Sequence, residues 1–168
     1  MRRSTIADQM PVSGIRKMFA LASKYENVIN LCIGEPDFET PQHIIDAAKR
    51  ALDAGYTKYT PSSGLLSLRK AVAEKFRRDN GLDYEPSQII VSNGAKHSIF
   101  NACYALLEEG DEVIIPAPYW LTYPEVVKVC GGVPVYIEGK KEDKFKFTPA
   151  DLERAITPRT KMLIFNSP

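Results

Sequence analysis

The second half of the chain alternates between short apolar runs and amphipathic stretches with helical spacing. The apolar runs predict strands over residues 89–92, 112–116, 133–138 and 161–165. The stretches between them predict helices over residues 95–109, 123–130 and 149–156. Strands that are separated by helices need crossover connections, so we predict an α/β fold with a mostly parallel sheet flanked by helices.

The first half is less regular. Apolar spacing predicts a helix from Ser13, a good N-cap, and an apolar run predicts a strand over residues 28–33. The segment Gly34-Glu35-Pro36-Asp37-Phe38 interrupts that strand. Thr40 and Pro41 then open a helix that ends near Gly55, with Thr40 as N-cap and Pro41 at the first helical position. A further helix is predicted over residues 64–80, with Gly81 as its stop.

One turn in the second half has a candidate chemical role. Asn93 and Gly94 join an apolar run to the helix that begins at Ala95. The first turn of such a helix leaves N–H donors unpaired and carries a partial positive charge, which suits a phosphate. Many turns of this kind are ordinary connections in α/β proteins, so the turn alone leaves both interpretations open.

The overall composition narrows the class of protein. The 168 residues include 22 basic and 21 acidic residues, giving a net charge of +1, which argues against nucleic acid or a membrane as partner. We find neither a secretory signal nor a membrane span, and we expect a cytoplasmic protein. Cys32, Cys103 and Cys130 are expected to be reduced and buried. His43 and His97 have no ligand-spaced partners, so we expect no metal site.

Four loop segments together suit a flat aromatic cofactor that carries a phosphate: residues 34–38, 56–60, 93–96 and 118–123. The sequence resembles the class I aminotransferases of the pyridoxal-phosphate fold type I group along its whole length. The resemblance rests on the segments Gly-Glu-Pro-Asp-Phe, Lys-Tyr-Thr-Pro-Ser-Ser-Gly-Leu-Leu-Ser-Leu-Arg, Gly-Asp-Glu-Val-Ile-Ile-Pro-Ala-Pro-Tyr-Trp and Ile-Thr-Pro-Arg-Thr-Lys. It implies pyridoxal 5'-phosphate as cofactor.

The resemblance also implies roles for single residues. Gly94, Ala95 and Lys96 would hold the cofactor phosphate through their backbone amides, and Trp120 would stack on the pyridine ring. Tyr59 would reach the phosphate in the neighbouring subunit of a homodimer, and Gly34 would lie beside the substrate α-carboxylate. Taken without the resemblance, the last three residues have plainer interpretations. These are a core aromatic for Trp120, a surface-loop tyrosine for Tyr59 and a turn glycine for Gly34.

The resemblance further implies an incomplete chain. Residues 1–45 would be an amino-terminal arm and a small-domain segment, and residues 46–168 the first part of the large cofactor-binding domain. The chain stops at Pro168, just after a predicted strand, where an α/β sheet gathers its site residues. The Schiff-base lysine would lie beyond Pro168, so we expect no catalytic residue within this chain and no activity from it alone.

The substrate is the least constrained part of the prediction. In aspartate-specific relatives a lysine like Lys96 helps to bind the distal carboxylate of the substrate, and Trp120 lies in a segment typical of that subgroup. The segment Ser13-Gly14-Ile15 departs from that subgroup and is closer to broad or aromatic-preferring relatives. We expect transfer of an amino group between aspartate and a 2-oxo acid such as 2-oxoglutarate. The alternatives are an aromatic or broad-specificity aminotransferase, an elimination reaction of the same fold type, and a non-catalytic phosphate-binding module.

Overall fold

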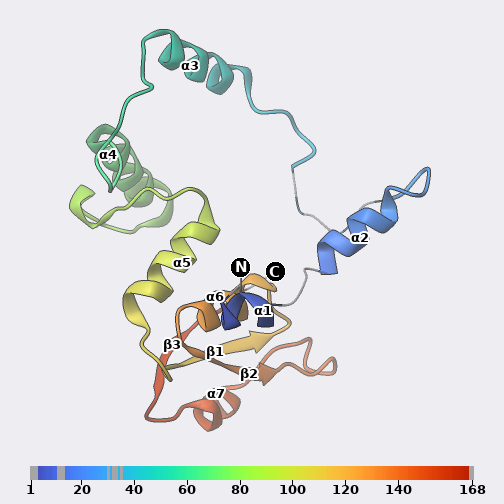
Figure 1. The fold of residues 1–168 in the computed structure, drawn as a ribbon. Helices are drawn as coiled ribbons and strands as arrows, with labels where there is room; N and C mark the ends of the chain where they lie inside the picture. Colours follow the sequence, from blue (N-terminus) through green and yellow to red (C-terminus); the bar gives the residue numbers. More distant parts are fainter. Residues whose placement is uncertain (1–3, 11–13, 30, 32–33, 35, 167–168) are drawn as a thin grey trace. The chain divides into compact units, whose positions relative to one another are not determined.

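The structure, a computed structural model, describes residues 4–10, 14–29, 31, 34 and 36–166. The chain forms two compact units, each described by itself below (Figure 1). The helical unit comprises Gly14–Ser92, and the sheet unit comprises Asn93–Pro168 together with Met1–Ser13. The predicted assignment of residues 1–45 to a small domain follows a different boundary and stays a prediction.

The helical unit contains α2 (Gly14–Ala22), α3 (Gln42–Asp53), α4 (Leu66–Lys75), the π-helical turn Phe76–Asn80 and the 3-10 turn Pro86–Gln88. The bounds of α2, α3 and α4 with its π-helical turn agree with the predicted helices, and Gly81 ends the third one in the left-handed conformation (φ 65°). The predicted N-cap of the first helix, Ser13, lies outside the described residues. The predicted cap of α3 is wrong by one position. Pro41 is the N-cap there, and no side chain caps the helix.

Two predicted strands of the helical unit are wrong or lie partly outside the described residues. Residues 89–92 form no strand, because the N–H of Val91 donates to the carbonyl of Ser63 in a loop (3.1 Å) and a loop supplies no continuous ladder. Val28, Ile29 and Leu31 are likewise not in a strand, and the other residues of the predicted strand 28–33 lie outside the description. An apolar run gives a strand only where a second strand pairs with it.

The sheet unit contains a parallel sheet with the order β2-β1-β3. Its strands are β1 (Glu112–Ala117), β2 (Val133–Glu138) and β3 (Thr160–Leu163). Its helices are α1 (Thr5–Gln9), α5 (Ala95–Leu106), α6 (Thr122–Val129) and α7 (Pro149–Ala155). Helices α6 and α7 lie on opposite sides of the sheet (Figure 1). The prediction of an α/β fold with a parallel sheet flanked by helices is therefore confirmed.

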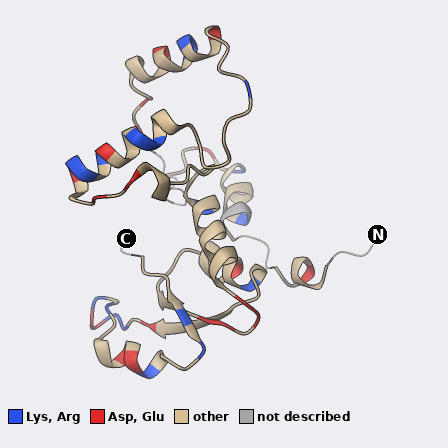
Figure 2. Cartoon of the chain, turned by 90° about the vertical axis from the view of Figure 1, so that its left-hand side faces the viewer, with Lys and Arg blue, Asp and Glu red and all other residues tan. Residues whose placement is uncertain are grey.

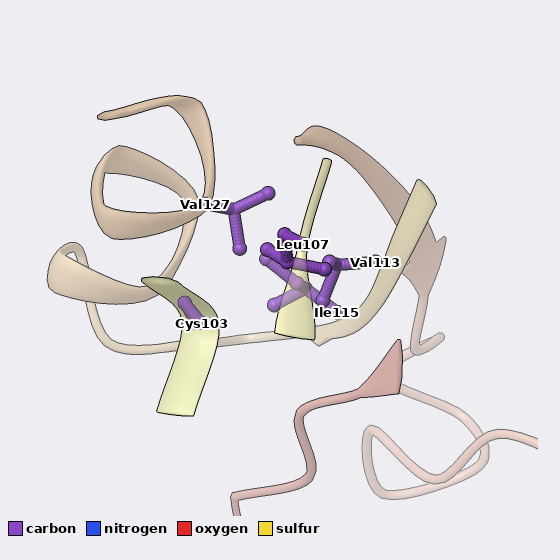
Figure 3. Packing of buried hydrophobic residues seen from close by; sticks show 5 residues of the cluster. All are labelled: Cys103, Leu107, Val113, Ile115 and Val127. Carbon is purple, nitrogen blue, oxygen red and sulfur yellow. The ribbon is translucent and has the colours of Figure 1, made fainter. Parts of the chain in front are cut away.

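The core of the sheet unit joins the two helices that carry the candidate site to the central strand. Successive residues of a strand point to opposite faces, so Val113 and Ile115 share one face of β1. They pack with Cys103 of α5, with Leu107 just after it, and with Val127 of α6 (Figure 3). Burying each side chain of this kind contributes roughly 1.5–3 kcal/mol. The cluster therefore fixes α5 and α6 against β1.

Glu112 anchors the other end of β1. Its buried carboxylate accepts hydrogen bonds from the Thr157 hydroxyl (2.6 Å) and from Nε of Arg159 (2.9 Å). These bonds hold the pKa of Glu112 below its ordinary range, because they stabilise the charged form. We call these bonds of Glu112 to Thr157 and Arg159 the Glu112 clamp. The register between β1 and β3 shifts between Glu112 and Val113, so the Glu112 clamp lies where the pairing of these two strands is irregular. It fixes the start of β3 against β1.

Charged side chains of both signs occur on the helices and loops of both units (Figure 2). Among the described residues, no helix is long and apolar enough to cross a membrane.

Candidate functional site

The turn before α5 adopts a backbone conformation that only glycine takes up readily. Gly94 is the N-cap of α5 with φ 81° and ψ 165°, a region in which a Cβ atom is strained. A Cβ added at Gly94 would meet no atom within 4 Å, so the constraint is the backbone itself and not a lack of space. Glycine also brings no side chain to cap the helix. The first turn therefore keeps its donors for another acceptor.

The hydrogen bonds around this turn show which donors remain. Nδ1 of His97 accepts the N–H of Asn93 (3.1 Å), and the Gly94 carbonyl accepts the N–H groups of His97 and Ser98 (3.1 and 3.3 Å). The N–H groups of Gly94, Ala95 and Lys96 donate to no acceptor within the described part of the chain. Three consecutive free donors at a helix N-terminus form a site that suits an anion.

Lys96 and Trp120 bring a cation and an aromatic ring to the same place. Nζ of Lys96 lies over the indole of Trp120, 5.0 Å from the ring centroid. Such a cation–π contact contributes about 0.5–1 kcal/mol at an exposed position. Trp120 is 37% exposed in this chain, and it follows the carboxyl end of β1. In α/β sheets, ligands gather at this end of the strands.

Two further residues hold Trp120 in place. The ring of Tyr123, in the first turn of α6, meets Trp120 edge to face with centroids 5.6 Å apart. The Tyr123 hydroxyl donates to Oδ1 of Asn166 (2.7 Å), which follows β3. We call Lys96, Trp120, Tyr123 and Asn166 the Trp120 cluster. It connects the start of α5 with the carboxyl ends of β1 and β3.

The loop that carries Trp120 is also tied to β2. Tyr119 stacks on Tyr136 of β2 with ring centroids 5.2 Å apart and planes 14° apart. Burial and the neighbouring Tyr119 phenol raise the pKa of Tyr136 to about 12, so the Tyr136 ring stays neutral at physiological pH. The loop after β1 thus contacts both neighbouring strands: Tyr119 stacks on β2, and Tyr123 bonds to the residue that follows β3.

The remaining predicted site residues belong to the helical unit. Tyr59 is fully exposed, and Gly34 is exposed with no atom within 4 Å of an added Cβ. The roles that the resemblance implies for Tyr59 and Gly34 stay predictions.

The thiols show no disulfide among the described residues. Cys103 is free and buried, and Cys130 is free and half-buried. Burial raises the pKa of both thiols, because the thiolate is poorly solvated there. Cys32 lies outside the described residues. Cys103 and Cys130 therefore belong to the packing of the core of the sheet unit.

Three residues of this site were not singled out from the sequence. His97 is the third residue of α5, a position where a polar side chain often caps the helix. The sequence alone did not show that its partner is the backbone N–H of Asn93. Tyr123 lies three residues after Trp120, which places both near one helix start. Asn166 directly follows the last predicted strand, where the sheet gathers polar side chains.

Comparison with known proteins defines the family. Residues 26–168 match the family described as aminotransferase class I and II. The aspartate aminotransferase of Geobacillus stearothermophilus is 60% identical over 142 residues, which are 84% of this chain and 36% of that protein. The aspartate/prephenate aminotransferase of Cereibacter sphaeroides is 55% identical over 148 residues, 88% of this chain and 37% of that protein.

The fold agrees with these relatives. The solved structure of aspartate aminotransferase from Thermus thermophilus with maleate covers this whole chain with a TM-score of 0.92 and 46% identity, and the chain covers 45% of it. The fold is that of an α/β protein of the pyridoxal-phosphate fold type I group. The chain belongs to the class I and II aminotransferase family. It spans between 36% and 45% of the length of the relatives named here.

The residues present fit the cofactor on which this family depends. The three free donors of Gly94, Ala95 and Lys96 match the oxygens of a phosphate monoester. The partly exposed indole of Trp120 offers a face for a flat ring. These residues would hold the phosphate and one face of the ring.

Proposed function

We propose that this chain is part of a longer aminotransferase that transfers an amino group between aspartate and a 2-oxo acid such as 2-oxoglutarate. In this proposal, Gly94, Ala95 and Lys96 bind the phosphate of pyridoxal 5'-phosphate, and Trp120 stacks on its ring. The cofactor supplies the electron sink that makes amino transfer feasible. The chain's own residues bind and orient it.

The observation that carries this proposal is the position of Lys96 over Trp120 next to three free N–H donors. This arrangement combines a phosphate site, a stacking face and a cation in one place. An ammonium group there is suited to a second carboxylate on the substrate, which favours a dicarboxylic amino acid. The relative solved with maleate, itself a dicarboxylate, supports the same preference.

An assay of the full-length protein tests the function. The protein is supplied with pyridoxal 5'-phosphate, aspartate and 2-oxoglutarate, and oxaloacetate is followed by its reduction with malate dehydrogenase and NADH. We expect turnover that depends on both substrates. Failure to form oxaloacetate from aspartate, together with turnover of phenylalanine or with release of ammonia, would refute the aspartate assignment.

A second candidate is an aminotransferase of broader specificity. The relative named as an aspartate/prephenate aminotransferase supports it, because prephenate carries a 2-oxo acid group on a cyclic side chain. The same assay, run with prephenate as the amino acceptor in place of 2-oxoglutarate, separates the two. A specificity constant for prephenate that equals or exceeds that for 2-oxoglutarate selects the broader function.

We further propose that the 168-residue chain alone is inactive. By resemblance, the lysine that binds the cofactor covalently lies outside it. The purified chain should give no borohydride-reducible adduct with pyridoxal 5'-phosphate at a defined lysine and no turnover of aspartate. A defined adduct with turnover would show that this chain contains the complete chemistry. A homodimer with Tyr59 at the neighbouring site, the substrate contact of Gly34 and a cytoplasmic location stay predictions.

A further inference from the structure

We infer that His97 is a positioning residue for the phosphate turn: its Nδ1 holds the N–H of Asn93, so that the following three N–H groups stay directed at the phosphate. This inference rests on the proposed function, because it assigns His97 a role in the same site. The observation behind it is the hydrogen bond from the Asn93 N–H to His97 Nδ1 (3.1 Å).

The bond resembles one half of a capping box but is displaced by one residue. In a capping box, the side chain at the third helical position accepts the backbone N–H of the N-cap itself, while the N-cap side chain accepts an N–H in return. His97 is at the third position of α5 and reaches back to Asn93, one residue before the N-cap. Gly94 has no side chain that could accept an N–H of the first turn. Because His97 binds the N–H of Asn93 and not that of Gly94, the N–H groups of Gly94, Ala95 and Lys96 stay available for an anion.

The backbone N–H groups of this turn fall into two sets, those that are hydrogen-bonded within the chain and those that are free. Asn93, His97 and Ser98 have their N–H groups occupied within the chain. Within the described part of the chain, the consecutive N–H groups of Gly94, Ala95 and Lys96 are left without an acceptor. A free Asn93 N–H would let the turn rotate about Gly94, whose backbone has no side chain to restrict it. The imidazole of His97 therefore selects the conformation in which the three donors converge.

The bond also fixes the tautomer of His97. An imidazole nitrogen that accepts a hydrogen bond carries no proton, so the neutral ring must hold its proton on Nε2. Nε2 is then a donor.

The test uses the full-length protein freed of cofactor. Dissociation constants are measured for pyridoxal 5'-phosphate and for pyridoxal, which lacks the phosphate, in wild type, His97→Ala, His97→Gln and the control His43→Ala. We expect His97→Ala to weaken pyridoxal 5'-phosphate about 3- to 10-fold, the loss of one hydrogen bond, with pyridoxal unchanged. His97→Gln keeps an acceptor at similar reach and should restore the affinity. His43, exposed in α3, should have no effect.

Nitrogen-15 chemical shifts supply an independent readout on wild-type protein at pH 8, where an ordinary histidine is neutral. The histidine resonance that disappears in His97→Gln should show an unprotonated Nδ1 and a protonated Nε2. The opposite tautomer would overturn the inference, and this holds even where His97→Ala fails to fold. Equal loss of affinity for pyridoxal and its phosphate, or no loss at all, would overturn it as well. Should wild type bind both ligands equally, the phosphate site of the proposed function itself would fail.

Discussion

Lys96 and Trp120 form a cation–π pair in which Nζ of Lys96 lies 5.0 Å from the centroid of the Trp120 ring. The pair joins the first turn of α5 to the loop after β1. The backbone of Lys96 therefore belongs to the proposed phosphate site, and its side chain belongs to the proposed ring site. One residue can thus act on the cofactor through its amide and on the substrate through its ammonium group.

This division predicts the effect of Lys96→Ala in the full-length enzyme. The backbone donor remains, so cofactor affinity should change little, while dicarboxylic substrates lose a charge-assisted contact of about 1.5–3 kcal/mol. The specificity constant for aspartate should fall more than the constant for phenylalanine. The matched control Lys128→Ala removes a lysine that pairs with Glu125 on α6. Equal losses for aspartate and phenylalanine would leave Lys96 without a role in substrate choice.

Gly94→Ala should distort the phosphate turn through the backbone alone. At φ 81° and ψ 165° a side chain is strained by about 1–3 kcal/mol, although the space for a Cβ is open. We expect a lower free energy of unfolding in urea and weaker binding of pyridoxal 5'-phosphate. Gly14→Ala is the control, because a Cβ there is also unobstructed and the backbone is ordinary helix. If Gly94→Ala changed neither the free energy of unfolding nor the affinity for pyridoxal 5'-phosphate, the turn would accept a side chain without strain.

Tyr123→Phe isolates the bond that ties Trp120 to the end of β3. The ring contact with Trp120 stays, and the hydroxyl bond to Asn166 (2.7 Å) is lost. The expected cost is about 0.5–1.5 kcal/mol in the free energy of unfolding. Asn166→Ala should cost a similar amount, and the double variant should cost less than the sum. Strict additivity in this double-mutant cycle would contradict a direct bond.

Glu112 should make stability depend on pH in the acid range. Its pKa is lowered in the folded state, so its stabilisation is present above the unfolded pKa, about 4.3, and is lost as the pH falls through the folded pKa. Urea unfolding of Glu112→Gln should show a weaker loss of stability than wild type below this pH. The control Glu125→Gln alters the ion pair with Lys128 on α6. If the free energy of unfolding fell with pH in the same way in wild type and in Glu112→Gln, the Glu112 clamp would not contribute to stability.

The sequence pattern predicted the sheet unit well because its strands are paired and buried. The bounds of β2 agree at both ends, and β1 and β3 differ by a residue or two. The predicted strand over residues 89–92 is wrong, because an apolar run does not reveal whether another strand will pair with it. Local signals such as the turn at Gly94 were readable. The bond between Tyr123 and Asn166 was not, since it joins residues 43 positions apart.

A crystal structure of the full-length protein with pyridoxal 5'-phosphate tests the proposed cofactor site most directly. We expect phosphate oxygens within about 3.2 Å of the backbone nitrogens of Gly94, Ala95 and Lys96. We also expect the pyridine ring to stack on the indole of Trp120. A phosphate bound elsewhere, with the first turn of α5 empty and Trp120 away from the ring, would contradict the proposed site.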